Sequence, residues 1–325
     1  MDFHPDADRR ALIADAFSRP LDALLPIARL HRADAKEPWA ALAELGIFGI
    51  AADPAIGGAG LTATEEALLA IELGRRLAGA RVLATLMAAH CADDDLRARI
   101  VAGDAQVAPA LLSGSALSVI DGAHADWLLV RHEGAAALIP ATRLTDPTEL
   151  DDGHWTAALT IAAAPTDLPW ASEAATRRVR LIEAAALCGV AACASDMAVG
   201  YAGLREQFGH PIGAFQAVKH HCANMAMAAM AARDATTFAA IALEQARPDA
   251  AFQIESALLL AIDAALANSR RNVQVHGGIG FSDEADPHLV VKRAHLLVEA
   301  CGGADTAAER VARAEAPMIR PGKNR

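Results

Sequence analysis

The sequence is poor in aromatic residues, in paired cysteines and in clustered positive charge. Phe, Trp and Tyr make up 4% of the 325 residues, and there is a single tyrosine. The five cysteines are odd in number and form no Cys-x-x-Cys pair, so neither a disulfide framework nor a metal site is indicated. The 29 Lys and Arg residues face 40 Asp and Glu residues, and the formal net charge is −11. Because no basic tract offsets this charge, nucleic-acid binding is excluded as the main role.

The sequence also has little that suggests export or a membrane span. It starts with Met-Asp-Phe-His-Pro-Asp, which places acid where a secretion signal carries base. Charges interrupt the apolar runs before they reach about 18 residues, as at Glu183, Asp196 and Asp263. We therefore expect a cytoplasmic protein with reduced thiols that does not enter a membrane.

Alanine is abundant, and it favours helices that approach one another closely. Apolar residues at helical spacing predict two or three short helices before residue 50, a helix capped by Thr62 that runs to about Leu77, and more helix from 80 to 101. Short alternating segments between about 106 and 165 predict a small sheet of four to six strands. Helical periodicity then returns near 172–205, 214–246, 249–273 and 285–315.

The chain is long enough for one sizeable core and a smaller companion domain. The element pattern predicts a mainly α fold in three parts. These are an N-terminal helical domain over 1–105, a reduced middle β-sheet over 106–168 and a C-terminal four-helix bundle over 169–325.

One polar segment within this Ala-rich sequence is Arg-Glu-Gln-Phe-Gly-His-Pro-Ile-Gly-Ala-Phe-Gln, residues 205–216. Its Gly and Pro residues mark a corner between two helices. Arg205, Gln207 and Gln216 can present hydrogen-bond donors around this corner. The free N–H groups at the start of the second helix also favour an anion there.

A second polar segment is Gln-Val-His-Gly-Gly-Ile-Gly-Phe, residues 274–281. Gly277 and Gly278 follow a helix and would let the backbone approach a ligand closely, with Gln274 and His276 as neighbouring donors. Two glycines after a helix are most often only a C-cap, so a purely structural role stays open for this segment alone. Together the two segments indicate a pyrophosphate or adenine site.

Both segments resemble signature motifs of the acyl-CoA dehydrogenase family. The family pattern R-x-x-F-G-x-P-I-x-x-F-Q matches residues 205–216 at every anchor, and Q-x-H-G-G-x-G-F matches residues 274–281. The segment from Trp39 to Arg75 is similar to the family's first helical domain. The resemblance implies the family's fold and its activity as a flavoprotein oxidoreductase, which uses FAD to convert an acyl-CoA into the 2,3-enoyl-CoA.

The resemblance also implies that both motifs reach across a subunit interface to the FAD of a partner subunit. It assigns Arg205 to the pyrophosphate, Phe208 and Phe215 to the adenosine side, and the other residues to polar and backbone contacts. The full set of implied cofactor-binding residues is Arg205, Gln207, Phe208, Phe215, Gln216, Gln274, Val275, His276, Gly277 and Gly278.

The family's catalytic residues are missing from this sequence. The position of the commonest catalytic glutamate falls on Cys301, and the alternative position on an earlier helix falls on Val179. A thiol is a poor general base, because it loses its proton near pH 8.5 and its thiolate is a nucleophile. Arg177 stands where the family has an acidic residue that helps to hold the substrate. The resemblance therefore implies no catalytic residue in this chain.

The middle region also departs from the family. Its usual Thr-Glu-Pro-x-x-Gly-Ser-Asp strand, which supports the flavin ring, has no match between Gln106 and Ala125. This pattern resembles the short subunit of heterotetrameric (α2β2) acyl-CoA dehydrogenases in bacterial steroid catabolism and lipid degradation. The resemblance implies a full-length partner subunit that shares the FAD, supplies the catalytic glutamate and holds the acyl-CoA. It also implies an electron-transfer flavoprotein or similar acceptor.

Two alternatives stay open. The chain could be a self-sufficient dehydrogenase with Glu299 as a displaced base, although an offset of two residues turns Glu299 to another face of its helix. It could also be a structural homologue that has lost flavin. Retention of Arg205, Gln216 and Gln274 in an Ala-rich bundle argues against the loss of flavin.

Overall fold

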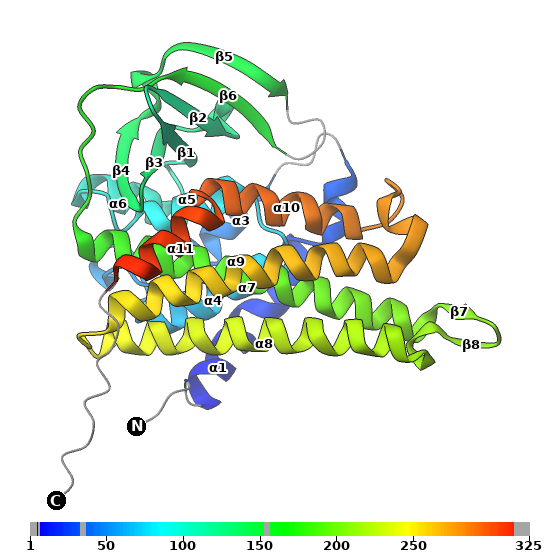
Figure 1. Ribbon diagram of the computed structural model, residues 1–325. Helices are drawn as coiled ribbons and strands as arrows, with labels where there is room; N and C mark the ends of the chain where they lie inside the picture. Colours follow the sequence, from blue (N-terminus) through cyan, green and yellow to red (C-terminus); the bar gives the residue numbers. More distant parts are fainter. Residues whose placement is uncertain (1–4, 6, 33–36, 153–156, 315–325) are drawn as a thin grey trace, which may run out of the picture.

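Three long helices lie side by side in the computed structural model, and a sheet covers one half of their length (Figure 1). The structure describes residues 5, 7–32, 37–152 and 157–314. The long helices are α7 (Glu173–Leu204), α8 (Gln216–Glu244) and α9 (Ala250–His276). The expected mainly α fold, with N-terminal helices, a small sheet and a C-terminal bundle, is confirmed.

Short helices form the N-terminal part and pack against the bundle. The fourth begins as the sequence predicts, because Thr62 and Glu65 form a capping box with each other's backbone N–H groups. The helices are α1 (Ala7–Ile13), α2 (Arg19–Leu24), α3 (Trp39–Glu44), α4 (Ala63–Arg75), α5 (Ala80–Ala88) and α6 (Asp94–Ala102). Between them lie a π-helical turn, η1 (Ala14–Ser18), and the 3-10 turns η2 (Ile27–His31), η3 (Ile47–Gly49) and η4 (Pro54–Ile56).

Six strands form one sheet, as the sequence predicts, in the order β4-β3-β1-β2-β6-β5. Strands β1 and β3 pair in parallel and all other neighbours are antiparallel. Alternate residues point to opposite faces, so Leu128 and Val130 enter the sheet's own core while Leu129 joins the main helical core. The strands are β1 (Val107–Ser113), β2 (Ala116–Ile120), β3 (Trp127–His132), β4 (Ala135–Pro140), β5 (Thr145–Asp152) and β6 (Ala158–Ala163).

The expected single helix over 285–315 is wrong. The chain instead forms α10 (Pro287–Ala300) and α11 (Gly303–Arg313). The two glycines between them, Gly302 and Gly303, have φ angles of +95° and +85°, which L side chains rarely adopt and which end a helix. After the bend, α11 packs against the first part of α9, where Arg310 donates to Glu255 at 2.9 Å.

Helices α4 and α7 touch through their backbones. A Cβ atom on Gly74 of α4 would lie 2.0 Å from the carbonyl oxygen of Ala186, and one on Gly189 of α7 would lie 2.1 Å from that of Ile71. Only glycine permits this approach at either position. The contact therefore sets the position of α7 against the N-terminal helices.

We expected no apolar run as long as a membrane span, and this expectation is wrong. By length and composition alone, three segments are long and apolar enough to cross a membrane. These segments are Glu173–Leu204, Gln216–Glu244 and Ala250–Phe281. Single acidic residues such as Glu183 and Asp263 do not lower the hydropathy of these Ala-rich windows enough to exclude them. The most apolar windows are 78%, 44% and 50% buried inside the protein, respectively, so α8 is the least covered of the three.

The Gly189→Ala substitution tests the contact between α4 and α7. We expect it to lower the free energy of unfolding by about 3 kcal/mol, since the new methyl group cannot fit without moving one helix. Thermal unfolding of the full chain measures the effect. Gly200→Ala is the matched control, because Gly200 lies in the same helix and a Cβ atom there would meet no atom within 4 Å, so this variant should be slightly stabilised. Equal melting temperatures for the two variants would contradict the close contact between α4 and α7 at Gly189.

Candidate functional site

The first motif forms a hairpin at the free end of the bundle (Figure 1). After α7 ends, β7 (Glu206–Gln207) pairs with β8 (His210–Pro211), and α8 begins at Gln216 after the 3-10 turn η7 (Ile212–Ala214). The two turn residues, Phe208 and Gly209, have φ angles of +55° and +79°. Two-residue hairpin turns need such positive φ values. The turn carries the Phe208 ring into solvent, where its residue is 90% exposed.

Donors and rings on this hairpin are available to a ligand. The side chain of Arg205 is exposed and has no hydrogen bond or ion pair to the described part of the chain. The rings of Phe208 and Phe215 meet edge to face with centroids 6.1 Å apart. Gln207 donates from Nε2 to the carbonyl oxygen of Glu206 at 2.8 Å, and Gln216 is exposed at the first turn of α8.

The second motif follows α9 as an open turn. The 3-10 turn η8 (Gly277–Phe281) begins at Gly277, whose φ is +67°. A Cβ atom at Gly277 or Gly278 would meet no atom within 4 Å, so both face open space. Gln274 is exposed, whereas the side chain of Val275 packs in the main core. Only the backbone of Val275 could contact a ligand.

A ring stack joins the two motifs. Tyr201 near the end of α7 lies over His276 at the end of α9, with centroids 4.1 Å apart and planes 22° from parallel. His276 Nδ1 lies 2.8 Å from the carbonyl oxygen of Asn272, which leaves Nε2 as an acceptor. Burial lowers the pKa of His276, and the Asn272 carbonyl partly offsets this effect. Sequence reasoning missed Tyr201, although it is the single tyrosine and lies four residues before Arg205.

The end of the bundle fits the pyrophosphate and adenosine of FAD. A free guanidinium can form bidentate, charge-assisted hydrogen bonds to a phosphate. Exposed aromatic rings can stack on a purine. The open space at Gly277 and Gly278 allows a ligand to approach the backbone closely. Among the described residues, no group of His, Cys, Asp and Glu is arranged to hold a metal ion.

The position of the family's catalytic base lies far from the end of the bundle that carries the two motifs. Cys301 follows the C-terminal end of α10, while η8 lies next to its N-terminal end, and the 14 residues of α10 span roughly 20 Å. Burial and the nearby charge of Glu183 raise the pKa of the Cys301 thiol far above its usual range, so the thiol stays protonated. Val179, at the alternative base position, is completely buried.

The cavity beside Cys301 is closed by a buried ion pair. Its volume is about 20 Å³, which leaves no room for an acyl chain. Arg131 of β3 donates to both carboxylate oxygens of Glu183 of α7, at 2.8 and 3.0 Å, and these side chains are only 3% and 7% exposed. Arg131 also donates to the carbonyl oxygen of Ala135 at 2.8 Å. Sequence reasoning did not find this pair, since its members lie 52 residues apart.

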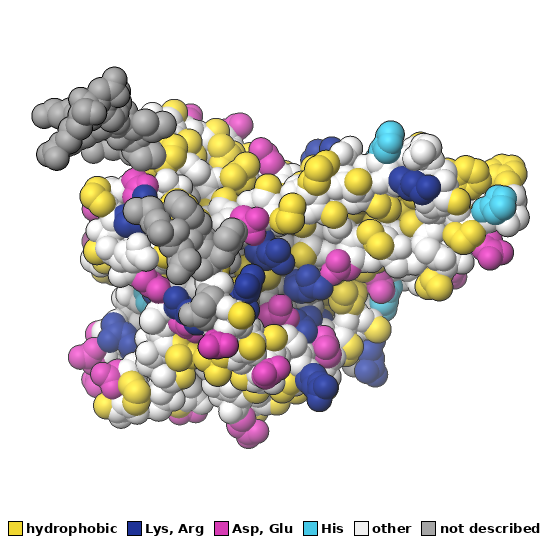
Figure 2. Space-filling view, turned by 90° about the horizontal axis from the view of Figure 1, so that it is seen from below, with side chains coloured by type: hydrophobic (Ala, Val, Ile, Leu, Met, Phe, Trp, Pro, Cys, Tyr) yellow, Lys and Arg dark blue, Asp and Glu magenta, His cyan; other side chains and the backbone are white. Residues whose placement is uncertain are grey.

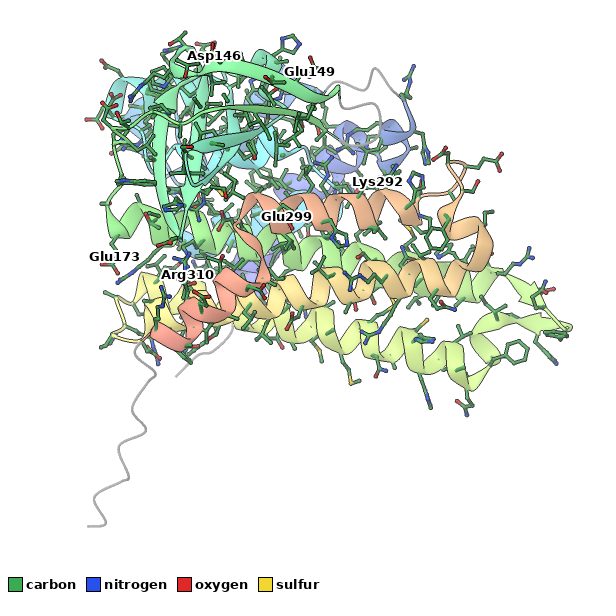
Figure 3. The ribbon with its side chains drawn as sticks, turned by 45° about the horizontal axis from the view of Figure 1, so that its top comes forward. Asp146, Glu149, Glu173, Lys292, Glu299 and Arg310 are labelled. Carbon is green, nitrogen blue, oxygen red and sulfur yellow. The ribbon has the colours of Figure 1, made fainter. Side chains whose placement is uncertain are left out.

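The other charged residues near the cavity have structural partners. Arg180 pairs with Glu255 of α9, and Arg177 pairs with Glu173 at the start of α7. Glu299 is exposed on α10 (Figure 3), whereas Leu297, Ala300 and Cys301 are the residues at the end of that helix that line the cavity. Among the described residues, the one carboxylate at the cavity is therefore Glu183, which Arg131 already holds.

Two family models match the chain on either side of the sheet. The model described as "Acyl-CoA dehydrogenase, N-terminal domain" matches residues 10–101. The model described as "Acyl-CoA dehydrogenase, C-terminal domain" matches residues 170–315, which contain both motifs.

Two curated relatives align with most of the chain. Acyl-CoA dehydrogenase FadE34 of Mycobacterium tuberculosis (strain ATCC 25618 / H37Rv) is 35% identical over 294 residues, which are 83% of this chain and 41% of that relative. Acyl-CoA dehydrogenase IpdE2 of the same strain is 30% identical over 267 residues, which are 79% of this chain and 80% of that relative. The chain thus spans less than half of FadE34 and most of IpdE2.

Solved structures share the fold. A variant of the Tcur3481-Tcur3483 steroid ACAD aligns with a TM-score of 0.77 and 23% identity, over 94% of this chain and 97% of that chain. The ChsE4-ChsE5 complex from Mycobacterium tuberculosis aligns with a TM-score of 0.76 and 24% identity, over 98% of this chain and 100% of that chain. At 23% and 24% identity, these alignments show a shared fold.

The ion pair in the closed cavity can be tested by removing one or both charges. Glu183→Gln should lower the free energy of unfolding by about 3–5 kcal/mol, because it leaves a buried guanidinium without a counter-charge. The double variant Arg131→Met with Glu183→Met should recover most of this loss, since it buries no charge. Urea unfolding of the full chain measures both. A double variant less stable than Glu183→Gln would show that the pair stabilises the fold beyond balancing its own charges.

Proposed function

The chain belongs to the acyl-CoA dehydrogenase family, and on that premise we propose that it is the base-lacking, flavin-supporting subunit of a heteromeric acyl-CoA dehydrogenase. Members of this family are oxidoreductases that use FAD. In the proposed assembly, this chain contacts the FAD held by a partner subunit, and the partner carries the catalytic glutamate. The assembled enzyme forms a 2,3-enoyl-CoA, and this chain alone is inactive.

One observation carries the proposal. Several motif residues at the end of the bundle, such as Arg205, Phe208 and Gln274, are exposed, while the cavity at the family's base position is about 20 Å³ and holds an ion pair in place of a base. A self-sufficient enzyme needs a base within hydrogen-bond reach of the substrate and space for the acyl chain. The cavity at the family's base position offers neither among the described residues, yet the chain keeps the end that can contact a cofactor from outside.

The chain's residues would act on the cofactor by binding and orientation. Arg205 would bind the pyrophosphate with charge-assisted hydrogen bonds. Phe208 and Phe215 would flank the adenosine, and the backbone at Gly277 and Gly278 would approach the cofactor closely. Bound FAD supplies the ring that accepts a hydride from the acyl-CoA. Tyr201 positions the second motif by stacking on His276.

The partner in this proposal is a full-length acyl-CoA dehydrogenase subunit in an α2β2 heterotetramer. The match to FadE34 leaves 59% of that relative (100% − 41%) outside the alignment, which is longer than the matched part and has room for a second subunit. ChsE4-ChsE5 is a complex of two differently named chains. An electron-transfer flavoprotein or similar acceptor would receive the electrons.

The proposed substrate is a steroid side-chain CoA ester, bound mainly by the partner. The support is the Tcur3481-Tcur3483 structure, which is titled a steroid ACAD. A cytoplasmic location belongs to the same proposal, supported by five cysteines that are free thiols in the structure. The long apolar helices then belong to a bundle in an oligomer, with no membrane involved.

Arg205→Ala in the complex with the partner chain tests the trans contact. We expect FAD affinity to fall about tenfold or more, because a charged hydrogen-bond donor to the pyrophosphate is lost. Flavin absorbance per heterodimer after dialysis measures this. Arg313→Ala, at an exposed arginine on α11, is the matched control and should keep its FAD. A full FAD complement and dehydrogenation by the chain without its partner would contradict the proposal.

The Glu299→Gln substitution tests the alternative in which Glu299 is a displaced catalytic base. The side chain of Glu299 is exposed and does not line the cavity, so turnover by the complex should stay within about twofold of the unsubstituted enzyme. Steady-state dehydrogenation with an artificial electron acceptor checks this. A loss of turnover by a factor of about 100 or more would assign the base to this chain.

A further inference from the structure

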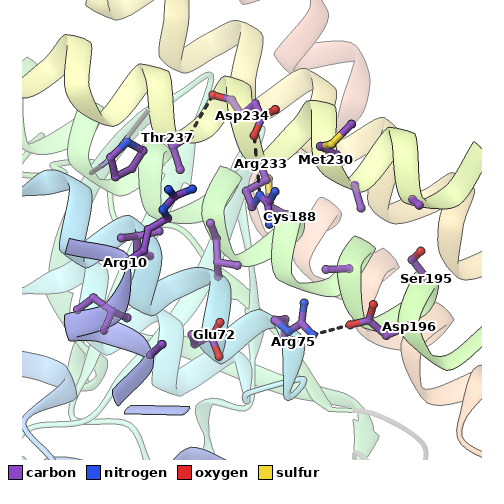
Figure 4. A pocket seen from close by; sticks show the side chains of 18 residues that line it. Arg10, Glu72, Arg75, Cys188, Ser195, Asp196, Met230, Arg233, Asp234 and Thr237 are labelled. Atoms are coloured by element: carbon purple, nitrogen blue, oxygen red, sulfur yellow. Dashed lines mark hydrogen bonds and ion pairs between the residues drawn. The ribbon is translucent and has the colours of Figure 1, made fainter. Parts of the chain in front are cut away.

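A separate cavity of about 440 Å³ lies between α1, α4, α7 and α8, on the side of the bundle turned away from the sheet (Figure 4). On this side, Lys and Arg side chains gather near the middle of the molecule (Figure 2). The protruding end of the helical bundle beside them is rich in apolar side chains. Among the described residues, the cavity shares no lining residue with the one beside Cys301 or with the two motifs. Its volume is within the range of small-molecule sites.

Apolar side chains form part of the cavity lining. They include Ile71 of α4, Ala192 of α7 and Ala229 and Met230 of α8, of which Met230 is half exposed. The helices cannot move together to fill the space, because polar contacts fix their spacing. The buried Asn268 of α9 donates to the carbonyl oxygens of Ala191 and Met225, at 3.1 and 2.9 Å, in two of the helices that form the wall.

A network of ion pairs fixes α1 over the cavity. Arg9 donates to Glu65 of α4 at 3.0 Å and to Glu244 of α8 at 2.8 Å. These bonds attach α1 to both helices and set the position of the next residue, Arg10. In Figure 4 the Arg10 side chain extends from α1 toward α8, where Arg233 and Asp234 lie.

Some of the charged side chains that line the cavity have close hydrogen-bond or ion-pair partners, and others do not. Asp196 pairs with Arg75, and Glu72 accepts from Arg76 at 2.7 Å and from Ser18 at 3.1 Å. Arg233 Nε lies 3.8 Å from Asp234, beyond hydrogen-bond distance. The side chain of Arg10 has no hydrogen bond or ion pair to the described residues. The charged lining residues are Arg10, Glu72, Arg75, Asp196, Arg233 and Asp234.

We propose that this cavity binds an amphiphilic carboxylate, with its head group between Arg10 and Arg233 and its apolar body against Ile71, Ala192 and Met230. Arg10 has no ion pair to the described residues and Arg233 is paired only with Asp234 at 3.8 Å, so the two guanidinium groups can hold a carboxylate, and the apolar part of the lining can cover a short aliphatic or alicyclic body. Asp234 faces the same head group and weakens its binding. The site goes beyond the proposed function, and neither depends on the other.

Calorimetric titration of the full chain with decanoate tests the site. One decanoate should bind per chain, and the double variant Arg10→Gln with Arg233→Gln should weaken binding about tenfold. Asp234→Asn should strengthen binding, since it removes the repelling charge. Ala229→Leu should block binding by filling the cavity. Arg313→Gln, at an exposed arginine outside the cavity, should leave binding unchanged.

The uncharged and cationic analogues supply the decisive comparison. Decanol and decyltrimethylammonium should bind much more weakly than decanoate. Decanol binding as tight as decanoate, or a double arginine variant with unchanged affinity, would overturn the proposal. The titration is repeated on the assembled complex, where loss of the site would mean that a partner chain covers the cavity and would also overturn it. If Ala229→Leu fails to fold, Asp234→Asn and the analogues still decide the outcome.

Discussion

Gly74 of α4 and Gly189 of α7 face each other so closely that a methyl group on either would overlap a backbone carbonyl oxygen. This contact determines where α7 lies, and α7 is the element on which the other features depend. Its 32 residues span roughly 48 Å. Near its start it carries Ile182, Glu183 and Ala186, which line the closed cavity, and at its end it leads into the exposed hairpin. One rigid helix thus holds apart a closed site and an open one.

The closed site shows how two buried charges can be accommodated within the fold. A guanidinium and a carboxylate in a cavity of about 20 Å³ satisfy each other, and Arg131 has a further backbone acceptor. A lone charge there would carry a large desolvation cost. Arg180 is likewise held by Glu255 rather than left free for a substrate. The four charged residues Arg131, Glu183, Arg180 and Glu255 are thus used for internal pairing.

The open site differs, because several of its groups are exposed. Phe208 is 90% exposed, the side chain of Arg205 makes no polar contact with the described residues, and Gly277 faces open space. Exposed aromatic and charged groups at one end of a bundle have little to contribute to a chain by itself. In the proposed assembly they contact the cofactor of another subunit, and the partly uncovered α8 beside them offers apolar surface to that subunit.

The sequence by itself determined the helical bundle, the small sheet, the Thr62 cap and the two motifs, since these depend on periodicity, local turns and short patterns. That the family's catalytic base is missing, with Cys301 and Val179 at its two positions, stays a prediction from the sequence. The sequence did not reveal the break at Gly302 and Gly303 within an otherwise helical pattern. Only the tertiary structure decided that Arg131 closes the cavity through Glu183, that Tyr201 joins the motifs, and that Arg10 and Arg233 meet at one cavity. Each of these depends on residues from separate elements meeting in space, which no local pattern encodes.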